Sequence, residues 1–355
     1  MQELNFQIKK AEEKDLKRIC DFLCKAIGVK KESLGVQTYY LKWKYFSNYA
    51  NKNLLLYLEL QGKILAVVGG IVCHYIINNR EYEVCFPVDW FSCPFNPIKK
   101  AGQKVMRSLI EKFPLSIAVG GSKVCFKPQI KVGFKDVGDV LILGIVRKNI
   151  KNFPMLVKRW IFHPQRMWKG INLGKRAIFN IKPEFLDYEI SNIDFYLPQL
   201  IQLFSKGIPK SILKEKWQYF MQQPCNPSRI IAFKFKNETS YALICEFTDI
   251  RQGYLGLVDV LMSPKHRVEE IFSVFAAYAW GKNKSAIFMT NNHYLITLAK
   301  SLGYNIYAKL RTQYFSSIGL KFYKTEELPA ISFLSLDELG YRYKPNEFIK
   351  NEGNF

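Results

Sequence analysis

One aspartate stands in the middle of an apolar, strand-like stretch, PVDWFSCP (Pro87–Pro94), in a chain of 355 residues. A carboxylate in such a place can take up a proton as a general base or anchor a cationic substrate. It can also be structural, by capping backbone N–H groups or by pairing with a lysine. A similar stretch, LVDVLMSP (Leu257–Pro264), follows 170 positions later, with Asp259 in the place of Asp89. Asp89 is therefore a candidate for catalysis, although its recurrence favours a structural role.

The repeat extends beyond this aspartate. The pair Gly133–Phe134 returns as Gly303–Tyr304 at the same offset of 170 positions. A helical segment with a tryptophan precedes each strand, LKWKYF (41–46) in the first copy and KEKWQYF (214–220) in the second. Matches that recur in the same order predict two copies of one fold.

The spacing of apolar residues predicts the elements of each copy. In the first copy we expect helices over 12–27, 39–48 and 98–113, and strands over 54–60, 64–77, 81–92, 115–119 and 140–145. In the second we expect helices over 198–204, around Trp217, over 268–280 and over 294–302, and strands over 229–235, 240–247, 254–262 and 286–290. Strict alternation along 81–92 places Glu83, Cys85, Pro87 and Asp89 on one face.

Composition limits the classes of protein. Hydrophobic residues make up 48% of the chain, which excludes a disordered protein. The net charge of +22 favours an anionic partner such as CoA, a nucleotide, tRNA or an anionic membrane surface. Eight cysteines without a CxxC pair and four scattered histidines predict reduced, buried thiols and no metal site. The polar N-terminus and the lack of a long apolar run predict a cytoplasmic protein, with possible peripheral contact at the inner membrane face.

The order of the elements resembles that of the GNAT N-acyltransferases. The resemblance rests on VDWFSCP, the helix that follows it, and AVGGS (118–122) leading to VGF (132–134). The whole chain resembles a tandem GNAT protein of the type associated with bacterial surface-polysaccharide biosynthesis. This implies an α/β fold, more closely an α+β mixed sheet, with two GNAT-like domains over 1–146 and 183–337. A basic aromatic linker (147–182) would join the domains, and a tail (338–355) would follow them.

The resemblance also implies an acyl-CoA-dependent N-acyltransferase. An amine, possibly on an amino sugar or glycan precursor, would attack the thioester of acetyl-CoA or another acyl-CoA directly. Asp89 would be the general base. The pantetheine arm would bind where two strands diverge, and the pyrophosphate would bind at the N-terminus of the next helix. The residues expected to hold this co-substrate are Phe91, Ser92, Lys99, Lys100, Ala101, Gly102, Gly120, Gly121 and Ser122.

The sequence departs from the family pattern at two places. The loop PFNPIKKAGQK (94–104) keeps only Gly102 of the usual glycine-rich signature, and its two prolines lack N–H donors. Lys99 and Lys100 would supply positive charge instead. Gln129 stands where the family has a tyrosine as general acid, and a carboxamide cannot protonate a thiolate. The second copy departs further, so we expect it to be non-catalytic and to complete a substrate cleft.

Two other functions stay open. A Fem-type transferase also pairs two GNAT domains but takes its acyl group from aminoacyl-tRNA, which fits the basic charge and the poor CoA loop. A catalytically inactive GNAT-like binding protein is the other alternative. The segment 140–183 contains no acidic residue and mixes basic with aromatic residues. It is interpreted either as a linker or as a contact with an anionic membrane surface or a lipid-linked substrate.

Overall fold

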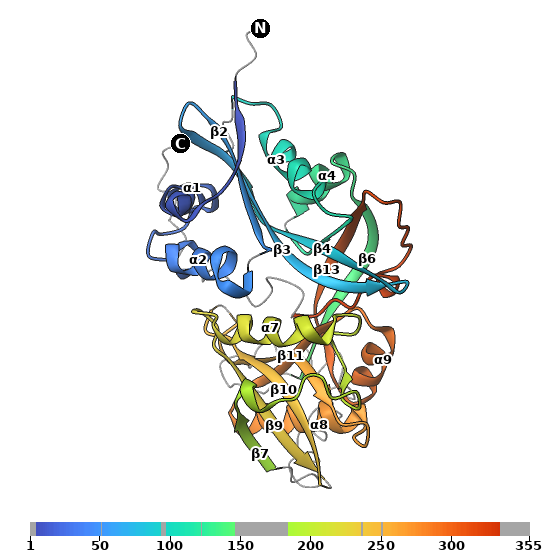
Figure 1. Cartoon of the computed structure of the whole chain (residues 1–355). Coiled ribbons are helices and arrows are strands. Elements are labelled where there is room, and N and C mark those ends of the chain that lie inside the picture. Colours follow the sequence, from blue (N-terminus) through green and yellow to red (C-terminus); the bar gives the residue numbers. More distant parts are fainter. Residues whose placement is uncertain are drawn as a thin grey trace, which may run out of the picture.

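The computed structural model describes residues 5–50, 52–93, 97–121, 123–145, 184–235, 237–249 and 251–333. The expected linker (147–182) and tail (338–355) lie outside these residues. Within them, one mixed sheet runs through the whole molecule and carries helices on both faces (Figure 1). The helices α1, α2 and α7 lie on one face, and α3, α4, α8 and α9 lie on the other.

The first half has the predicted series of two helices, a three-strand meander, a helix and further strands. Its elements are β1 (Gln7–Lys10), α1 (Leu16–Ile27), α2 (Thr38–Phe46), β2 (Leu54–Leu60), β3 (Lys63–Ile77), β4 (Arg80–Ser92), α3 (Ala101–Ile110), β5 (Leu115–Val119), α4 (Lys123–Lys131) and β6 (Lys135–Ile145). The helix α1 ends as predicted, because Gly28 adopts the left-handed conformation (φ 77°) that suits glycine. The helix α3 begins three residues later than predicted, and α4 continues through Pro128.

The second half repeats this series with one exchange of element type. Its elements are β7 (Glu184–Tyr188), β8 (Ile201–Gln202), α7 (Lys210–Met221), β9 (Ser228–Phe235), β10 (Glu238–Glu246), β11 (Tyr254–Met262), α8 (Val268–Gly281), β12 (Ser285–Thr290), α9 (His293–Ser301) and β13 (Asn305–Ser316). The helix predicted over 198–204 is wrong. That segment contains the short strand β8, which pairs antiparallel with the end of β11. The strands β1, β7 and β13 were not predicted.

The order of strands shows that the two halves exchange their last strands. The order is β1-β2-β3-β4-β5-β13-β6-β12-β11-β10-β9-β7. Strand β13 of the second half lies between β5 and β6, and β6 of the first half lies between β13 and β12. Each half therefore contributes one strand to the part of the sheet formed by the other half. The order is symmetric, because strands at equal distances from its two ends, such as β4 and β11, are equivalent in the two halves.

One apolar core joins the halves on the face that carries α1, α2 and α7. At its centre the two tryptophan helices meet. The ring of Trp43 in α2 stacks on that of Tyr219 in α7, with 4.5 Å between centroids. The Trp43 indole N–H also donates to the Tyr219 carbonyl oxygen at 2.9 Å. The opposite face has two separate cores, one under α3 and one under α8 and α9.

Candidate functional site

Strands β4 and β5 diverge soon after they meet. These parallel strands pair only at Val84–Leu115 and Cys85–Ser116, although both continue for several residues. We call the facing, mutually unpaired edges of 86–92 and 117–119 the slot. In the second half, β11 and β12 pair at four positions and end at Leu257–Phe288. Pro87 takes the position of Leu257 and has no N–H to donate, so the slot opens two residues earlier.

The equivalent edge in the second half is already occupied by the chain itself. The residues Ile201–Gln202 of β8 pair with Leu261–Met262 of β11. The Leu203 N–H also donates to the Val260 carbonyl oxygen at 3.0 Å. An extended ligand would need these same backbone groups. The two halves therefore differ most at the place where the GNAT resemblance predicts a pantetheine arm.

The helices that follow β4 and β11 also differ at their N-termini. Lys100 begins α3 in a left-handed conformation (φ 60°), without a side-chain cap and without an acidic residue in the first turn. The first turn of α8 carries Glu269 and Glu270, and the Glu270 carboxylate accepts the Arg267 N–H at 2.8 Å. A helix N-terminus attracts anions through its free N–H groups and its dipole. At α8 an acidic side chain already fills that place, whereas at α3 the place is not capped.

Gly102 brings the start of α3 close to the end of β4. The Trp90 indole N–H donates to the Gly102 carbonyl oxygen at 2.7 Å. A Cβ atom at Gly102 would lie 3.3 Å from both Ser92 and Trp90, which is tighter than ordinary contact. Ala101 is buried beside it, and Phe91 is half-buried on the opposite face of the sheet. The structure thus brings together three of the predicted co-substrate residues, Ser92, Ala101 and Gly102, and it gives Gly102 a packing role as well.

Two of the predicted co-substrate residues, Gly120 and Gly121, follow β5. Gly120 (φ 73°) and Gly121 (φ 96°) both adopt the left-handed region, which favours glycine. The Gly120 N–H donates to the carbonyl oxygen of Arg311 in β13 at 2.8 Å. The two residues lead the chain from β5 towards α4. Ser122 lies outside the described residues, and binding of the co-substrate by Gly120 and Gly121 stays a prediction.

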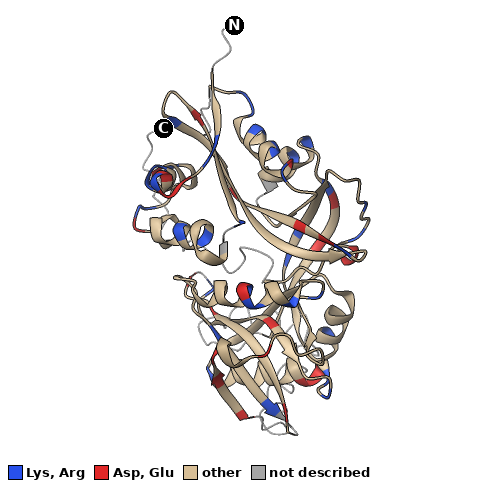
Figure 2. Cartoon of the chain, viewed as in Figure 1, with Lys and Arg blue, Asp and Glu red and all other residues tan. Residues whose placement is uncertain are grey.

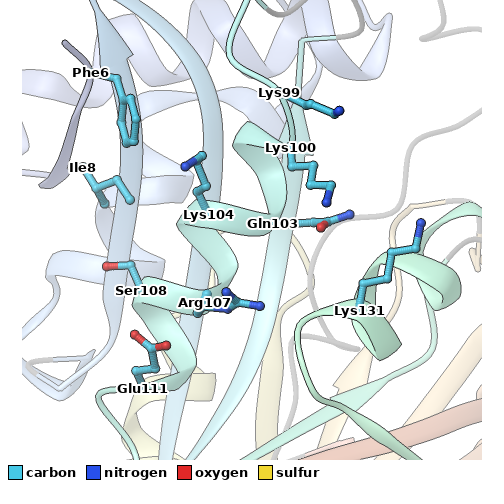
Figure 3. A pocket seen from close by; sticks show the side chains of 10 residues that line it. All are labelled: Phe6, Ile8, Lys99, Lys100, Gln103, Lys104, Arg107, Ser108, Glu111 and Lys131. Atoms are coloured by element: carbon cyan, nitrogen blue, oxygen red, sulfur yellow. The ribbon is translucent and has the colours of Figure 1, made fainter. Parts of the chain in front are cut away.

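A basic groove runs along the outer side of α3 (Figure 3). It has a volume of about 750 Å³ and opens to solvent. Five cationic side chains and one acidic side chain, Glu111, line it. The cationic residues are Lys99, Lys100, Lys104, Arg107 and Lys131. Blue segments on α3 and α4 in Figure 2 show the same concentration of charge. The groove includes the uncapped N-terminus of α3, so positive charge surrounds the place where a phosphate would bind.

Asp89 lies in a β-bulge that turns its side chain to the α2 face. The register between β3 and β4 shifts there, so that Val68 faces two residues, Asp89 and Trp90. Asp89 has a φ of 48°, which is uncommon for a residue other than glycine. Cys85 packs under α3 on the other face. The prediction that Cys85 and Asp89 share a face is therefore wrong, because a bulge breaks the two-residue period.

Two residues of α2 hold the Asp89 carboxylate. Its Oδ2 accepts from Lys44 Nζ at 2.7 Å and from the Tyr45 hydroxyl at 2.6 Å. The Lys44 side chain is 1% exposed and that of Asp89 is 23% exposed. The tyrosine reaches this position only because Gly69 lies beneath it, where a Cβ atom would lie 1.8 Å from the phenol oxygen. The interpretation of Asp89 as the partner of a lysine is confirmed, and a role as general base stays a prediction.

Sequence reasoning missed Lys44, Tyr45 and Gly69, although Lys44 and Gly69 each left a signal. Lys44 follows Tyr40 by four positions in a short helix, which places a charged residue on the buried face. Gly69 and Gly70 interrupt the apolar strand β3. Glycine inside a strand often marks a close approach of another group.

Asp259 has a different environment from Asp89. It is fully buried, and its Oδ2 accepts the Trp217 indole N–H at 3.0 Å. Burial raises the pKa of Asp259 to about 6, although the Trp217 hydrogen bond partly opposes this shift. Among the described residues, no lysine or arginine pairs with it. The Asp89 carboxylate is partly exposed and therefore accessible to a substrate, whereas the buried Asp259 carboxyl is not.

No protein-family model matches the sequence, and no curated protein matches it. Solved structures match the fold at low identity. A GCN5-related N-acetyltransferase (GNAT) from Anabaena variabilis is 10% identical, with a TM-score of 0.56, 87% of this chain covered and 72% of that one. One from Kribbella flavida is 10% identical, with a TM-score of 0.55 and coverage of 88% and 71%. A tandem GNAT protein from the clavulanic acid biosynthesis pathway is 9% identical, with a TM-score of 0.55, and covers 90% of this chain with its whole length. The fold is a tandem GNAT fold.

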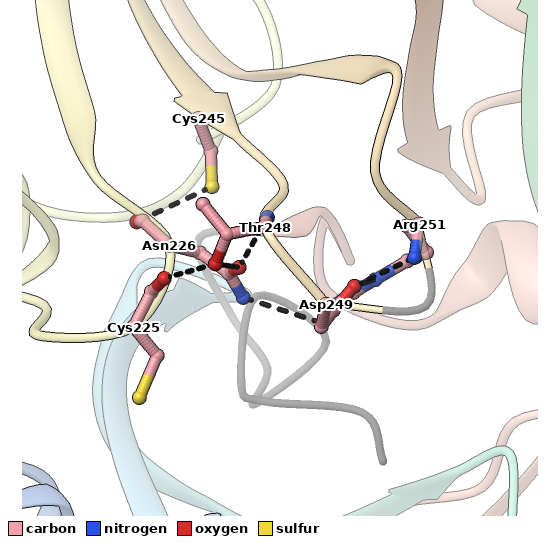
Figure 4. Close-up of polar contacts among 6 residues, drawn as sticks. All are labelled: Cys225, Asn226, Cys245, Thr248, Asp249 and Arg251. Carbon is pink, nitrogen blue, oxygen red and sulfur yellow. Dashed lines mark hydrogen bonds and ion pairs between the residues drawn. The ribbon is translucent and has the colours of Figure 1, made fainter. Parts of the chain in front are cut away.

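A further polar cluster of this tandem GNAT fold is saturated by its own bonds (Figure 4). The Arg251 guanidinium binds the Asp249 carboxylate through two nitrogens, and both side chains are buried. Asn226 donates to Asp249 at 3.4 Å and accepts the Thr248 N–H at 3.0 Å. These bonds fix the connection between β10 and β11 to the chain before β9, so we assign the cluster to the fold.

The described residues contain no group of three or more His, Cys, Asp or Glu side chains placed to hold a metal ion. None of their helices has the length and apolar character needed to cross a bilayer. All eight cysteines are free thiols, and six of them are buried.

Proposed function

We propose that the protein is an acyl-CoA-dependent N-acyltransferase whose co-substrate binds in the first half. The observation that carries the proposal is the early divergence of β4 and β5, which pair only at Val84–Leu115 and Cys85–Ser116. The pantetheine arm would pair with the free edges of the slot as an added strand does. The pyrophosphate would bind at the uncapped N-terminus of α3, and the basic groove would neutralise the remaining phosphate charge.

The reaction is a direct transfer. The amine nitrogen attacks the thioester carbonyl, a C–N bond forms, and the C–S bond breaks to release the CoA thiolate. A thiol has a pKa of about 8.5, so the thiolate leaves without a strong general acid, which suits the carboxamide at Gln129. Asp89 would take the proton from the amine. Lys44 and Tyr45 both bind its Oδ2, so they fix the carboxylate in place and neither bond involves Oδ1.

In this proposal the second half does not bind the co-substrate. The support comes from three contrasts with the first half: β8 pairs with the edge of β11, Glu270 fills the N-terminus of α8, and Asp259 is buried. The acceptor we propose is the amine of a sugar or glycan precursor. The expected membrane contact depends on 147–182, outside the described residues, so it stays a prediction.

Calorimetric titration tests the proposal directly. The full chain is titrated with acetyl-CoA and with longer acyl-CoAs, and transfer to a panel of amines is followed by the release of free CoA thiol. We expect one binding site per chain. Failure of every acyl-CoA to bind would overturn the proposal.

The basic groove and the net charge of +22 keep aminoacyl-tRNA as a second candidate donor. Binding of tRNA through several phosphate contacts weakens steeply with salt. Titration of tRNA between low and physiological salt therefore separates the two. Tight, salt-dependent binding of tRNA without binding of any acyl-CoA would favour the Fem-type alternative.

A further inference from the structure

A buried glutamine of the second half lies beside the slot of the first half. Gln313 belongs to β13 and pairs with Ala118 of β5 on one side and with Asp136 of β6 on the other. Gln313 is buried, with 1% of its surface exposed. Neither its Oε1 nor its Nε2 has a hydrogen-bond partner among the described residues. A buried carboxamide without partners is unfavourable, so the fold alone does not account for it.

The register places this side chain on the face of the sheet that carries α3. Its strand partner Ala118 packs in the core under α3, and so does Phe315, two residues further along β13. Residues two apart on a strand point to the same face. A ligand added beside β5 in the slot would lie about two strand spacings, or about 9.6 Å, from β13, so the glutamine side chain would extend over Ala118 of β5 on the α3 face to approach it.

The second half provides an internal comparison. The pair Ala118–Gln313 corresponds to the pair Phe288–Leu143. Phe288 lies 170 positions after Ala118, and Leu143 lies 170 positions before Gln313. Leu143 is fully buried in the apolar core under α8. The half whose strand edge is filled by its own chain thus has leucine at this position. The half with an open slot has an amide that lacks a partner.

We propose that Gln313 hydrogen-bonds to the acyl-CoA bound in the slot, so that the second half contributes a binding residue to the site of the first. This inference rests on the proposed function. The pantetheine arm carries amide groups and the acyl end carries a thioester carbonyl. A glutamine carboxamide can both donate to and accept from such groups. The exchange of β13 between the halves is what delivers this residue to the slot.

The test replaces Gln313 by methionine, which keeps the length of the side chain and removes its polar atoms. We expect Gln313→Met to bind acetyl-CoA at least tenfold more weakly while the unliganded protein melts about 2 °C higher, because an unpaired buried amide is gone. S-acetylpantetheine, which lacks the nucleotide phosphates, should lose affinity by a similar factor. The mirror variant Leu143→Gln should melt lower and bind acetyl-CoA as the wild type does.

Side-chain amide NMR gives a readout that a structural role would not move. The Gln313 NH₂ signals, assigned by their loss in Gln313→Met, should shift when acetyl-CoA is added to the wild type. Unchanged affinity in Gln313→Met overturns the inference but leaves the proposed function intact. A lower melting temperature of this variant without ligand also overturns it, because the amide would then serve the fold. If the wild type binds no acyl-CoA, both the inference and the proposed function fail.

Discussion

The ammonium of Lys44 lies 2.7 Å from Oδ2 of Asp89 and is almost completely buried, whereas the carboxylate keeps an exposed side. Water is excluded from the cation, so the carboxylate is its main compensation. The same carboxylate is the proposed proton acceptor. Stability and activity therefore depend on one pair, and the two effects have to be separated by experiment.

Asp89→Asn is expected to slow acyl transfer at least about 100-fold, since a general base contributes about 10² to 10⁴ in rate. It should also lower the free energy of unfolding by about 1–3 kcal/mol, because Lys44 would remain buried without a counter-charge. Steady-state kinetics and urea denaturation measure the two effects.

The double variant Lys44→Met/Asp89→Asn is the matched control. Removal of both charges should recover most of the lost stability, since no unpaired charge remains. Activity should stay as low as in Asp89→Asn. Recovery of activity together with stability would show that Asp89 only neutralises Lys44.

Asp259→Asn tests the titration of the buried carboxyl in the second half. Its pKa is raised to about 6 in the folded protein, against about 4 for an ordinary aspartate, so the folded state holds the proton more tightly. Stability from this group is therefore present below about pH 4 and is lost as the pH rises to 6. Relative to the wild type, Asp259→Asn should gain up to about 3 kcal/mol between pH 4 and pH 7. A difference in unfolding free energy between the wild type and Asp259→Asn that does not change with pH, measured by urea denaturation, would contradict this. The rate of acyl transfer by Asp259→Asn should stay within about twofold of that of the wild type.

Lys99→Gln/Lys100→Gln tests the phosphate end of the site. Each charge-assisted contact contributes about 1–3 kcal/mol, so acetyl-CoA affinity should fall at least tenfold. The affinity for S-acetylpantetheine should not change, because that ligand lacks the phosphates of the nucleotide. Arg267→Gln, at the start of α8, is the control in the second half and should leave both affinities unaltered. Equal losses for both ligands would mean that the lysines act on the fold.

The bounds of several elements could be predicted from the sequence because their apolar pattern is local. The strands over 54–60, 115–119 and 254–262 match the structure at both ends. The recurrence of Asp89 as Asp259 also indicated the duplicated fold. These features depend on residues that are close in the chain, so pattern alone detects them.

Other features depend on distant parts of the chain. Nothing in Asn305–Ser316 indicates that β13 would enter the sheet of the other half. The apolar spacing around Leu200 resembles a helix, but pairing with β11 made this segment a strand instead. The bulge at Asp89 breaks the two-residue period, and β4 itself has no glycine to mark it. Lys44 became part of the site only when α2 packed over β4.

The exchange of β6 and β13 predicts that the halves do not fold alone. A fragment of residues 1–146 lacks β13, so β5 and β6 would be left one strand apart with exposed edges. We expect this fragment to aggregate or to give an NMR spectrum with poor chemical-shift dispersion. Co-expression with a fragment of residues 183–355 should restore a well-dispersed spectrum. Cooperative unfolding of the fragment by itself would contradict this.

Hydrogen exchange with and without acetyl-CoA tests the central claim most directly, because it reports on the backbone edges of both halves at once. We predict slower exchange over 86–92 and 117–121 when acetyl-CoA is bound, and no change over 257–262 and 287–290. Protection in the second pair of segments, or no protection in either, would contradict a co-substrate site in the first half.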